Sequence, residues 1–379
     1  MHIHIIGGGI GGLTTAIALQ KKGFQVRVSE AAPELRPVGA GIIMASNAMQ
    51  IAQRLGYYEE VLRAGNPLSW FGAADHLGKA LQVTDIARIA AQYGAPSVAI
   101  HRGALQQVLL RQLLPDTLVL NRRFEAIEKQ DAGGVRVRFA DGSTEESDLL
   151  IGADGIRSRV RKALFGEIPL RYSGQTCWRG ILPHRLAEVS KGVELWGKTG
   201  GKRIALIQIG ENQVYFYFTL KAKAGQSFPN DRVAEFLQEQ LREFPAEYAE
   251  IIGKAQPADI FHDDLHDLPR LAQWHQGSVL LIGDAAHATT PNLGQGGCQA
   301  VEDGYALAEC LATQPNPSLA FTAFEKQRRE KVDYVVNTSF LVGQLSNIGG
   351  PLLWPLRNAM LRATPASVGE AQIGKLMQL

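Results

Sequence analysis

Residues 2–30 read HIHIIGGGIGGLTTAIALQKKGFQVRVSE, and their pattern indicates the class of fold. The apolar run 2–6 predicts a short strand, and the helical spacing of 12–22 predicts a helix that stops at Gly23. Alternating apolar and polar residues over 24–30 predict a second strand. The stretch is therefore a βαβ unit, the opening element of a nucleotide-binding fold.

The loop between the first strand and the helix contains Gly7, Gly9 and Gly12 in the pattern GxGxxG. In such a loop the first glycine permits a tight turn, the second lets a pyrophosphate approach the backbone, and the third lets the helix pack on the strand. The phosphate then lies at the positive end of the helix. Glu30 ends the second strand, and its carboxylate can accept hydrogen bonds from both ribose hydroxyls. The combination predicts a dinucleotide site but does not separate NAD from FAD.

Composition limits the class of protein. The 379 residues suffice for two to three domains. The 40 glycines in this length exceed the usual ~7%, which indicates loops that turn tightly or approach a ligand closely. Lys and Arg number 39 against 37 for Asp and Glu, and this near-balance argues against a dedicated role on nucleic acid or at a membrane surface.

Cysteine usage and hydropathy favour a cytoplasmic location. Cys177, Cys298 and Cys310 are odd in number and form no CxxC pair, so neither a disulfide framework nor a metal site is expected. No apolar run approaches the ~18–20 residues that span a bilayer, so no integral membrane segment is expected. The apolar N-terminus lacks a basic leading segment and reads as strand, turn and helix rather than as a signal peptide.

The rest of the chain mixes helical and strand patterns without an internal repeat. The predicted elements are a helix at 101–114, a hairpin of 134–140 with 147–151, a hairpin of 203–209 with 213–220, a strand at 278–282, and helices from about 298 to the C-terminus. Two further glycine clusters follow predicted strands. They read GADGIRSR at 152–159 and GDAAHATTPNLGQGG at 283–297.

The three glycine clusters, in this order, resemble the flavin-dependent aromatic hydroxylases, the single-component FAD monooxygenases typified by para-hydroxybenzoate hydroxylase. The resemblance covers nearly the whole chain. Cys298 after the GQGG glycines and the sequence Trp178-Arg179-Gly180 resemble the branch with urate hydroxylase and hydroxybenzoate 6-hydroxylase. The fold that this implies is α/β, with a Rossmann-like FAD-binding domain, an interleaved strand-rich substrate domain and C-terminal helices.

The resemblance also implies roles around FAD. Asp284 would contact the ribityl chain, the loop 291–297 would pass beside the flavin ring, and the loop 38–42 would lie over it. Asp154 would touch the pyrophosphate region, or it only caps the following helix. The expected FAD-binding residues are Gly7, Gly9, Gly12, Glu30, Ala31, Gly41, Arg102, Gln106, Asp154, Asp284, Gly294, Gly296 and Gly297.

The reaction that the resemblance implies uses NAD(P)H and dioxygen. NAD(P)H reduces FAD, dioxygen forms a flavin C4a-hydroperoxide, and its distal oxygen is transferred to an electron-rich carbon of a small aromatic or heteroaromatic substrate. The protein supplies position, electrostatics and exclusion of water. No second GxGxxG is present, so NAD(P)H is expected to bind transiently.

The substrate is expected to lie against the 203–220 hairpin. If its turn is the three residues 210–212, Arg203, Ile207, Tyr215 and Tyr217 share one face. Arg203 would hold an anionic substrate and Tyr215 would orient a ring, although aromatic alternation also fits a packed core. Pro291 would line the oxygen side because it has no N–H. These three are the candidate catalytic residues.

The domains are expected to interleave along the chain. The FAD-binding domain takes 1–75, 100–170 and 268–320, the substrate domain takes 76–99 and 171–267, and 321–379 forms a C-terminal helical segment. A monomer or a homodimer is expected. Two alternatives stay open: an FAD-dependent reductase or desaturase of an isoprenoid-like substrate, and a flavin-binding regulator without turnover.

Overall fold

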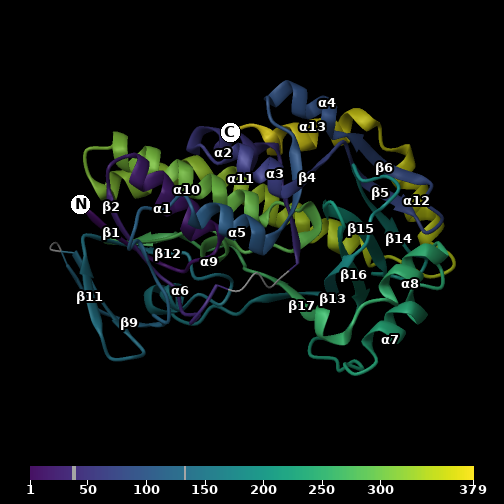
Figure 1. Ribbon diagram of the computed structural model, residues 1–379, viewed down its shortest axis with the longest axis horizontal. Coiled ribbons are helices and arrows are strands. Elements are labelled where there is room, and N and C mark those ends of the chain that lie inside the picture. The colour runs from purple at the N-terminus through teal and green to yellow at the C-terminus, as the bar shows by residue number, and fades with distance from the viewer. Residues whose placement is uncertain (36–39, 132–133) are drawn as a thin grey trace.

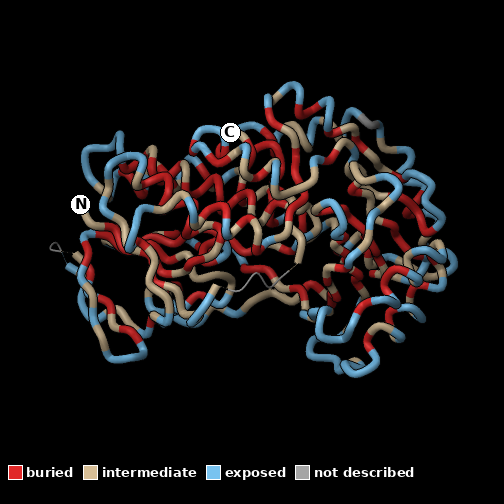
Figure 2. The backbone as a smooth tube through the Cα atoms, in the orientation of Figure 1, coloured by how far each residue is buried: buried red, intermediate tan, exposed pale blue. Residues whose placement is uncertain are grey.

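The computed structural model describes residues 1–35, 40–131 and 134–379. Residues 38–39 of the predicted 38–42 loop therefore lie outside the described residues. Figure 1 shows two sheet-based halves, with β1, β2 and β12 in one and β13 to β17 in the other, covered by long C-terminal helices. Figure 2 shows that the buried backbone runs through both halves.

The nucleotide-binding half is built on a six-stranded sheet that is parallel apart from β18. Its order is β18 (His275–Gln276), β19 (Val279–Leu281), β12 (Leu149–Gly152), β1 (His2–Ile6), β2 (Gln25–Ser29) and β8 (Leu118–Val119). The predicted βαβ unit is confirmed as β1, α1 (Ile10–Lys21) and β2. The helix begins two residues earlier than expected and ends before Gly23, which has φ +83°.

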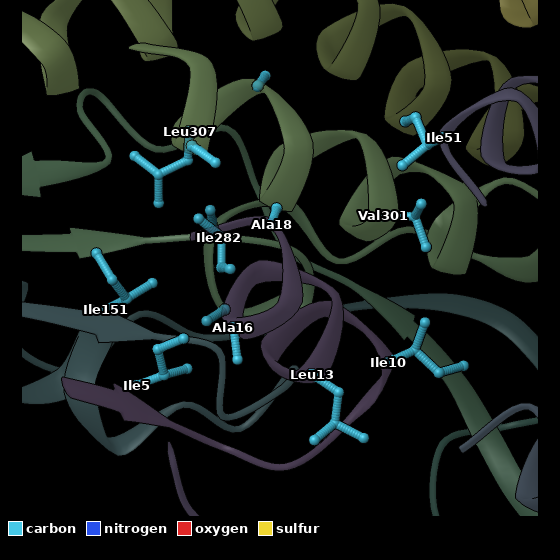
Figure 3. Close-up of a cluster of buried hydrophobic side chains, with 14 of the residues drawn as sticks. Ile5, Ile10, Leu13, Ala16, Ala18, Ile51, Ile151, Ile282, Val301 and Leu307 are labelled. Atoms are coloured by element: carbon cyan, nitrogen blue, oxygen red, sulfur yellow. The ribbon is translucent and has the colours of Figure 1, made fainter. Parts of the chain in front are cut away.

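Helix α1 is covered by α10 (Gly296–Thr313), and Figure 3 shows the apolar contact between them. Leu13 and Ala16 of α1 and Val301 and Leu307 of α10 belong to one buried core that also includes Ile5 of β1. A Cβ on Gly304 would lie only 2.8 Å from the backbone nitrogen of Thr15. Part of the glycine excess therefore serves the close packing of these two helices and not the ligand.

Two small antiparallel sheets flank the parallel one. Their orders are β3 (Gly41–Met44), β7 (Ser97–His101), β4 (Gly65–Leu68), and β11 (Thr144–Ser147), β10 (Gly134–Phe139), β9 (Phe124–Asp131). The predicted hairpin of 134–140 with 147–151 is wrong in its second strand. The hairpin partner of β10 ends at Ser147, and the apolar run that follows becomes β12, a central strand of the six-stranded sheet.

The second half is a seven-stranded sheet, antiparallel except where β14 pairs with β5. Its order is β17 (Ile260–Asp267), β13 (Arg171–Pro183), β16 (Gln213–Lys221), β15 (Arg203–Gly210), β14 (Lys191–Trp196), β5 (Trp70–Asp75) and β6 (Ala80–Asp85). Strand β5 thus belongs to the sheet although it lies within the 1–75 segment assigned to FAD binding. The division into domains stays a proposal.

The predicted hairpin of β15 with β16 is confirmed, but its turn is shorter than expected. Gly210 pairs with Gln213, which leaves a two-residue loop, and a bulge between Gln208 and Gly210 restores the register. Ile207 therefore lies opposite Tyr215, and the predicted shared face is confirmed.

The remaining helices lie between and outside the sheets. They are α2 (Ser46–Leu55), α3 (Tyr58–Ala64), α4 (Ile86–Tyr93), α5 (Arg102–Leu110), α6 (Arg159–Phe165), α7 (Val233–Gln240), α8 (Ala246–Ile252), α9 (Asp284–His287), α11 (Pro317–Ser346), α12 (Leu353–Ala363) and α13 (Ala366–Met377), with 3-10 turns η1 (Pro257–Asp259) and η2 (Pro291–Leu293). None of the helices in the described ranges has the length and apolar character needed to cross a membrane.

Candidate active site

A cavity of about 990 Å³ extends from the glycine loop after β1 to the seven-stranded sheet. All three glycine clusters and the β15–β16 hairpin contribute to its wall. The predicted site residues that line it are Gly7, Gly9, Glu30, Ala31, Gly41, Arg102, Asp154, Arg203, Tyr215, Asp284, Pro291, Gly294, Gly296 and Gly297. Gly12 and Gln106 are not among the lining residues. The fold thus brings together residues that lie nearly 300 positions apart in sequence.

The glycines of the first loop divide into packing positions and an open position. Gly7 has φ +113°, and a Cβ there would lie 2.4 Å from the carbonyl oxygen of Ala153. A Cβ on Gly12 would lie 2.0 Å from the carbonyl oxygen of Gly7. A Cβ on Gly9 would meet nothing within 4 Å. Gly7 and Gly12 therefore allow the turn and the packing, whereas Gly9 leaves the backbone open to the cavity.

Glu30 and Gln106 hold the glycine loop from two sides. Glu30 accepts hydrogen bonds from the backbone nitrogens of Gly8, at 2.7 Å, and Ala32, at 2.8 Å. Both carboxylate oxygens keep a lone pair for another donor. Gln106 donates from Nε2 to the carbonyl oxygen of Gly8 at 2.9 Å. Gln106 thus contacts the loop itself, and its predicted direct contact with FAD stays a prediction.

Asp154 caps α6, which is the alternative weighed from the sequence. It accepts from the Ser158 hydroxyl at 2.5 Å and from the backbone nitrogens of Arg159, at 2.7 Å, and Val160, at 3.2 Å. Burial raises the pKa of Asp154, and these hydrogen bonds oppose the rise. Asp154 also lines the cavity, so its contact with FAD stays a prediction beside the cap.

Asp284 is the first residue of α9 and opens onto the cavity. The protein packed around it raises the pKa of its carboxyl, and the charges of His287 and Arg102 oppose this. His287 forms a buried hydrogen bond, with Nε2 2.6 Å from Oδ2 of Asp303. His287 is therefore structural, as the sequence led us to expect, and Asp284 remains the acceptor on the cavity wall.

The N-terminus of α10 faces the cavity through Gly296 and Gly297. The Cys298 thiol fixes this end to β3, since Sγ donates to the carbonyl oxygen of Ile43 at 3.3 Å and accepts from the nitrogen of Ala45 at 3.4 Å. Burial raises the pKa of Cys298 to about 12, so the thiol stays neutral. The positive end of α10 therefore points at the cavity from a fixed position.

Arg203 is the centre of a buried polar cluster on the sheet side of the cavity. Its guanidinium donates to Oγ1 of Thr219 at 3.1 Å, to Oδ1 of Asn292 at 2.6 Å, and to Oε1 of Glu194 and of Gln175, each at 3.4 Å. The partners come from β16, η2, β14 and β13. Most donors of Arg203 are thus used within the protein, and its contact with an anionic substrate stays a prediction.

Sequence reasoning missed the partners of Arg203. Glu194 also accepts from Nε1 of Trp196 at 2.5 Å and forms a hydrogen bond with the Tyr217 hydroxyl. In the sequence, Glu194 stood out only as an acidic residue two positions before Trp196 in a strand-rich segment. Asn292 follows Pro291 within the GDAAH-to-GQGG segment, and that place in the segment was its signal.

Tyr215 and Tyr217 present neutral phenols beside this cluster. Burial raises the pKa of both hydroxyls well above the ordinary range. A Cβ on Gly41 would lie 2.5 Å from Cγ of Tyr215, so the absence of a side chain at Gly41 is what allows the ring to lie there. The C-terminal helices contribute apolar side chains to the cavity wall: Val342, Leu345, Leu361 and Ile373.

These features fit FAD. The open backbone at Gly9 and the oriented carboxylate of Glu30 can take a pyrophosphate and a ribose. Asp284 and the N-terminus of α10 can take a polyol chain and an anionic ring further along the same cavity. Among the residues that the structure describes, no group of three or more His, Cys, Asp or Glu is placed to hold a metal ion.

Comparisons with known proteins agree with this fit. The family model described as "FAD binding domain" matches residues 1–339. The aurachin C monooxygenase/isomerase of Stigmatella aurantiaca is 37% identical, over 99% of this chain and 97% of the relative. The 2-heptyl-3-hydroxy-4(1H)-quinolone synthase of Pseudomonas aeruginosa is 35% identical, over 96% of this chain and 94% of the relative. The structure of Klebsiella pneumoniae HpxO complexed with FAD and uric acid is 27% identical, with a TM-score of 0.91 over 100% of this chain and 96% of that chain.

Proposed function

The chain belongs to the FAD-dependent aromatic hydroxylases, and on that premise we propose that its substrate is a planar heteroaromatic ring carrying an apolar substituent. As a member, it is a monooxygenase that uses FAD and NAD(P)H. This favours the hydroxylase over the reductase and the regulator weighed from the sequence. One relative is named as a monooxygenase/isomerase and another as the synthase of a hydroxylated quinolone.

The observation that supports a two-part substrate is that the cavity wall carries both polar and apolar side chains. The polar cluster around Arg203 contributes Glu194 and Asn292. The C-terminal helices contribute Leu361 and Ile373. A ring with hydrogen-bonding atoms suits the polar groups, and an alkyl substituent suits the apolar ones, because each buried group then meets a surface of its own kind.

The name of one relative agrees with such a molecule. The 2-heptyl-3-hydroxy-4(1H)-quinolone synthase is named for a heteroaromatic ring that carries a heptyl chain. The relative complexed with uric acid binds a heteroaromatic ring without such a chain. The apolar side chains of the cavity wall favour the substituted ring for this chain.

The chemistry at the ring carbon is supplied by FAD when it is bound, which accepts hydride and activates dioxygen. We propose that the protein's own residues orient the substrate and keep water out. The neutral Tyr215 hydroxyl would donate a hydrogen bond to a ring oxygen, whereas the Tyr217 hydroxyl already donates to Glu194. Arg203 would act as a positioning residue, because it holds Asn292 of η2 against the sheet.

The test is a substrate panel with the purified holoenzyme. We expect 2-alkyl-4-quinolones to give NAD(P)H oxidation coupled to hydroxylated product, and the unsubstituted 4-quinolone to give a higher KM and more hydrogen peroxide. Leu361→Ser should remove most of this preference by raising KM for the alkylated ring only. Equal KM values for both rings, or coupled turnover with urate but not with quinolones, would contradict the proposal.

A further inference from the structure

Helix α12 presents an apolar face to solvent that has no partner within the described chain. Leu352, just before the helix, is 86% exposed, Leu356 is 68% exposed and Met360 is 52% exposed. Their spacing of four residues places them on one side, together with Leu353. In Figure 1, α12 lies at the outer end of the molecule next to β6, far from the N-terminus.

The opposite face of α12 is fixed to the protein. Arg357 donates from Nη1 to the carbonyl oxygen of Ile348 at 2.8 Å and from Nη2 to that of Gly197 at 2.9 Å. The ring of Trp354 lies 5.3 Å from that of His76. Because these buried contacts hold the helix, its outer leucines are held toward solvent.

Two lysines lie near the ends of α12, and the Glu243 carboxylate lies beside one of them, accepting from the backbone nitrogen of Lys198 at 2.6 Å. Residues 351–363 contain no acidic residue. Lys198 lies 6.0 Å from the ring centroid of Trp354, and Lys79 follows the exposed Leu77 in the turn between β5 and β6. Within the described part of the chain neither lysine has an ion-pair partner, whereas the third cation, Arg362, is paired with Asp75.

We propose that this surface, called the α12 face and defined by Leu77, Leu352, Leu353, Leu356 and Met360 with its two flanking lysines, docks on an anionic lipid bilayer. An apolar face flanked by lysines without an ion-pair partner in the described chain complements the acyl boundary and the anionic headgroups. A twofold contact would instead bring together two copies of this lysine-flanked surface, and their like charges would oppose it. The near-balance of charge over the whole chain does not exclude lipid binding, because the lysines that would contact the headgroups are grouped beside α12.

The docking would also connect to the site. Leu361 points from the inner side of α12 to the cavity wall, so the helix separates the cavity from the proposed lipid surface. A substrate with an apolar substituent, which rests on the proposed function, would be concentrated in that lipid. Vesicle binding is measured without substrate and without turnover, so failure of the docking and failure of the proposed function are distinguishable.

The experiment is vesicle flotation of the FAD-loaded protein. We expect it to float with phosphatidylglycerol-containing vesicles, weakly with pure phosphatidylcholine vesicles, and less at high salt. Leu352→Ser with Leu356→Ser and Met360→Ser should weaken binding by roughly a hundredfold. Lys79→Glu with Lys198→Glu should weaken it by at least about tenfold. The matched control is Leu114→Ser with Leu319→Ser, two exposed leucines outside the α12 face, and it should bind as the parent does.

Retained FAD and an unchanged circular dichroism spectrum would show that each variant is folded. The proposal is overturned if the parent does not float with anionic vesicles, or if the triple serine variant floats as the parent does. It is also overturned if sedimentation without vesicles shows a dimer that the triple variant abolishes while no protein binds lipid. That result would assign the α12 face to a second copy.

Discussion

Alanine at Gly12 should damage the fold, whereas alanine at Gly9 should damage only the binding of FAD. At Gly12 the new Cβ would lie 2.0 Å from the carbonyl oxygen of Gly7, and ordinary contact begins at 3.4 Å. Helix α1 and the loop must therefore separate by about 1.4 Å (3.4 − 2.0). Overpacking of this size against backbone costs about 3 kcal/mol of unfolding free energy.

At Gly9 the backbone has φ −76° and ψ −179°, which alanine adopts without strain, and the new Cβ meets nothing within 4 Å. The unfolding free energy of the apoprotein should change by no more than about 1 kcal/mol. The methyl group occupies the space into which a pyrophosphate would fit, and the loss of about two hydrogen bonds to a charged group costs about 3 kcal/mol, or roughly a hundredfold in Kd.

The assay pairs thermal unfolding of the apoproteins with FAD titration by fluorescence quenching. Apo Gly9→Ala should melt near the parent and bind FAD weakly, and apo Gly12→Ala should melt well below both. The reasoning is refuted if apo Gly9→Ala loses as much stability as apo Gly12→Ala. It is equally refuted if Gly9→Ala binds FAD with the parent's Kd.

Three more results are expected. Asp284→Ala should lose FAD on gel filtration, with Kd raised about tenfold, because an acceptor on the cavity wall is removed; a variant that stays fully yellow would contradict this. Arg203→Lys keeps the charge but not the forked contacts to Asn292 and Glu194, so hydrogen peroxide per NAD(P)H oxidised should rise; an unchanged ratio would contradict the positioning role. Burial, with the charges of neighbouring cations, lowers the pKa of His4 to about 3. Between pH 6.5 and 3 the unfolded chain therefore binds a proton at His4 that the folded chain does not bind. The free energy of unfolding should fall by up to about 1.4 kcal/mol per pH unit as the pH is lowered from 6.5 towards 3. His4→Gln should flatten that slope in urea titrations, and an unchanged slope would assign it to other groups.

The elements that sequence reasoning predicted well are those whose signal is local. The βαβ start was predicted because apolar spacing and the glycine at 23 define its limits. The error at 147–151 arose because the chain changes sheets at Asp148, whose carboxylate accepts a hydrogen bond from the nitrogen of His2 at 2.6 Å. A contact across 146 residues leaves no trace in local periodicity.

The site divides in the same way. Glycine clusters indicated the cofactor side because some of these glycines, such as Gly7 with φ +113°, meet a backbone demand of their own loop. The partners of Arg203 were not predicted, since Gln175, Glu194 and Asn292 come from separate elements and each looks like an ordinary polar residue in its own segment. Their buried donors and acceptors find hydrogen-bond partners only when these separate elements come together in the fold.

The polar cluster has one consequence for how the two halves act together. Asn292 belongs to η2, which leads through Gly294 to the start of α10 on the cofactor side, whereas Arg203 belongs to the sheet on the substrate side. Asn292 also donates to the Ser339 carbonyl oxygen of α11 at 2.8 Å, so the same side chain contacts a helix that lines the cavity. A change in the Arg203 contacts should therefore alter the loop beside the cofactor although Arg203 itself is not expected to contact the cofactor. Arg203→Lys should for this reason change the ratio of peroxide to product and not FAD retention.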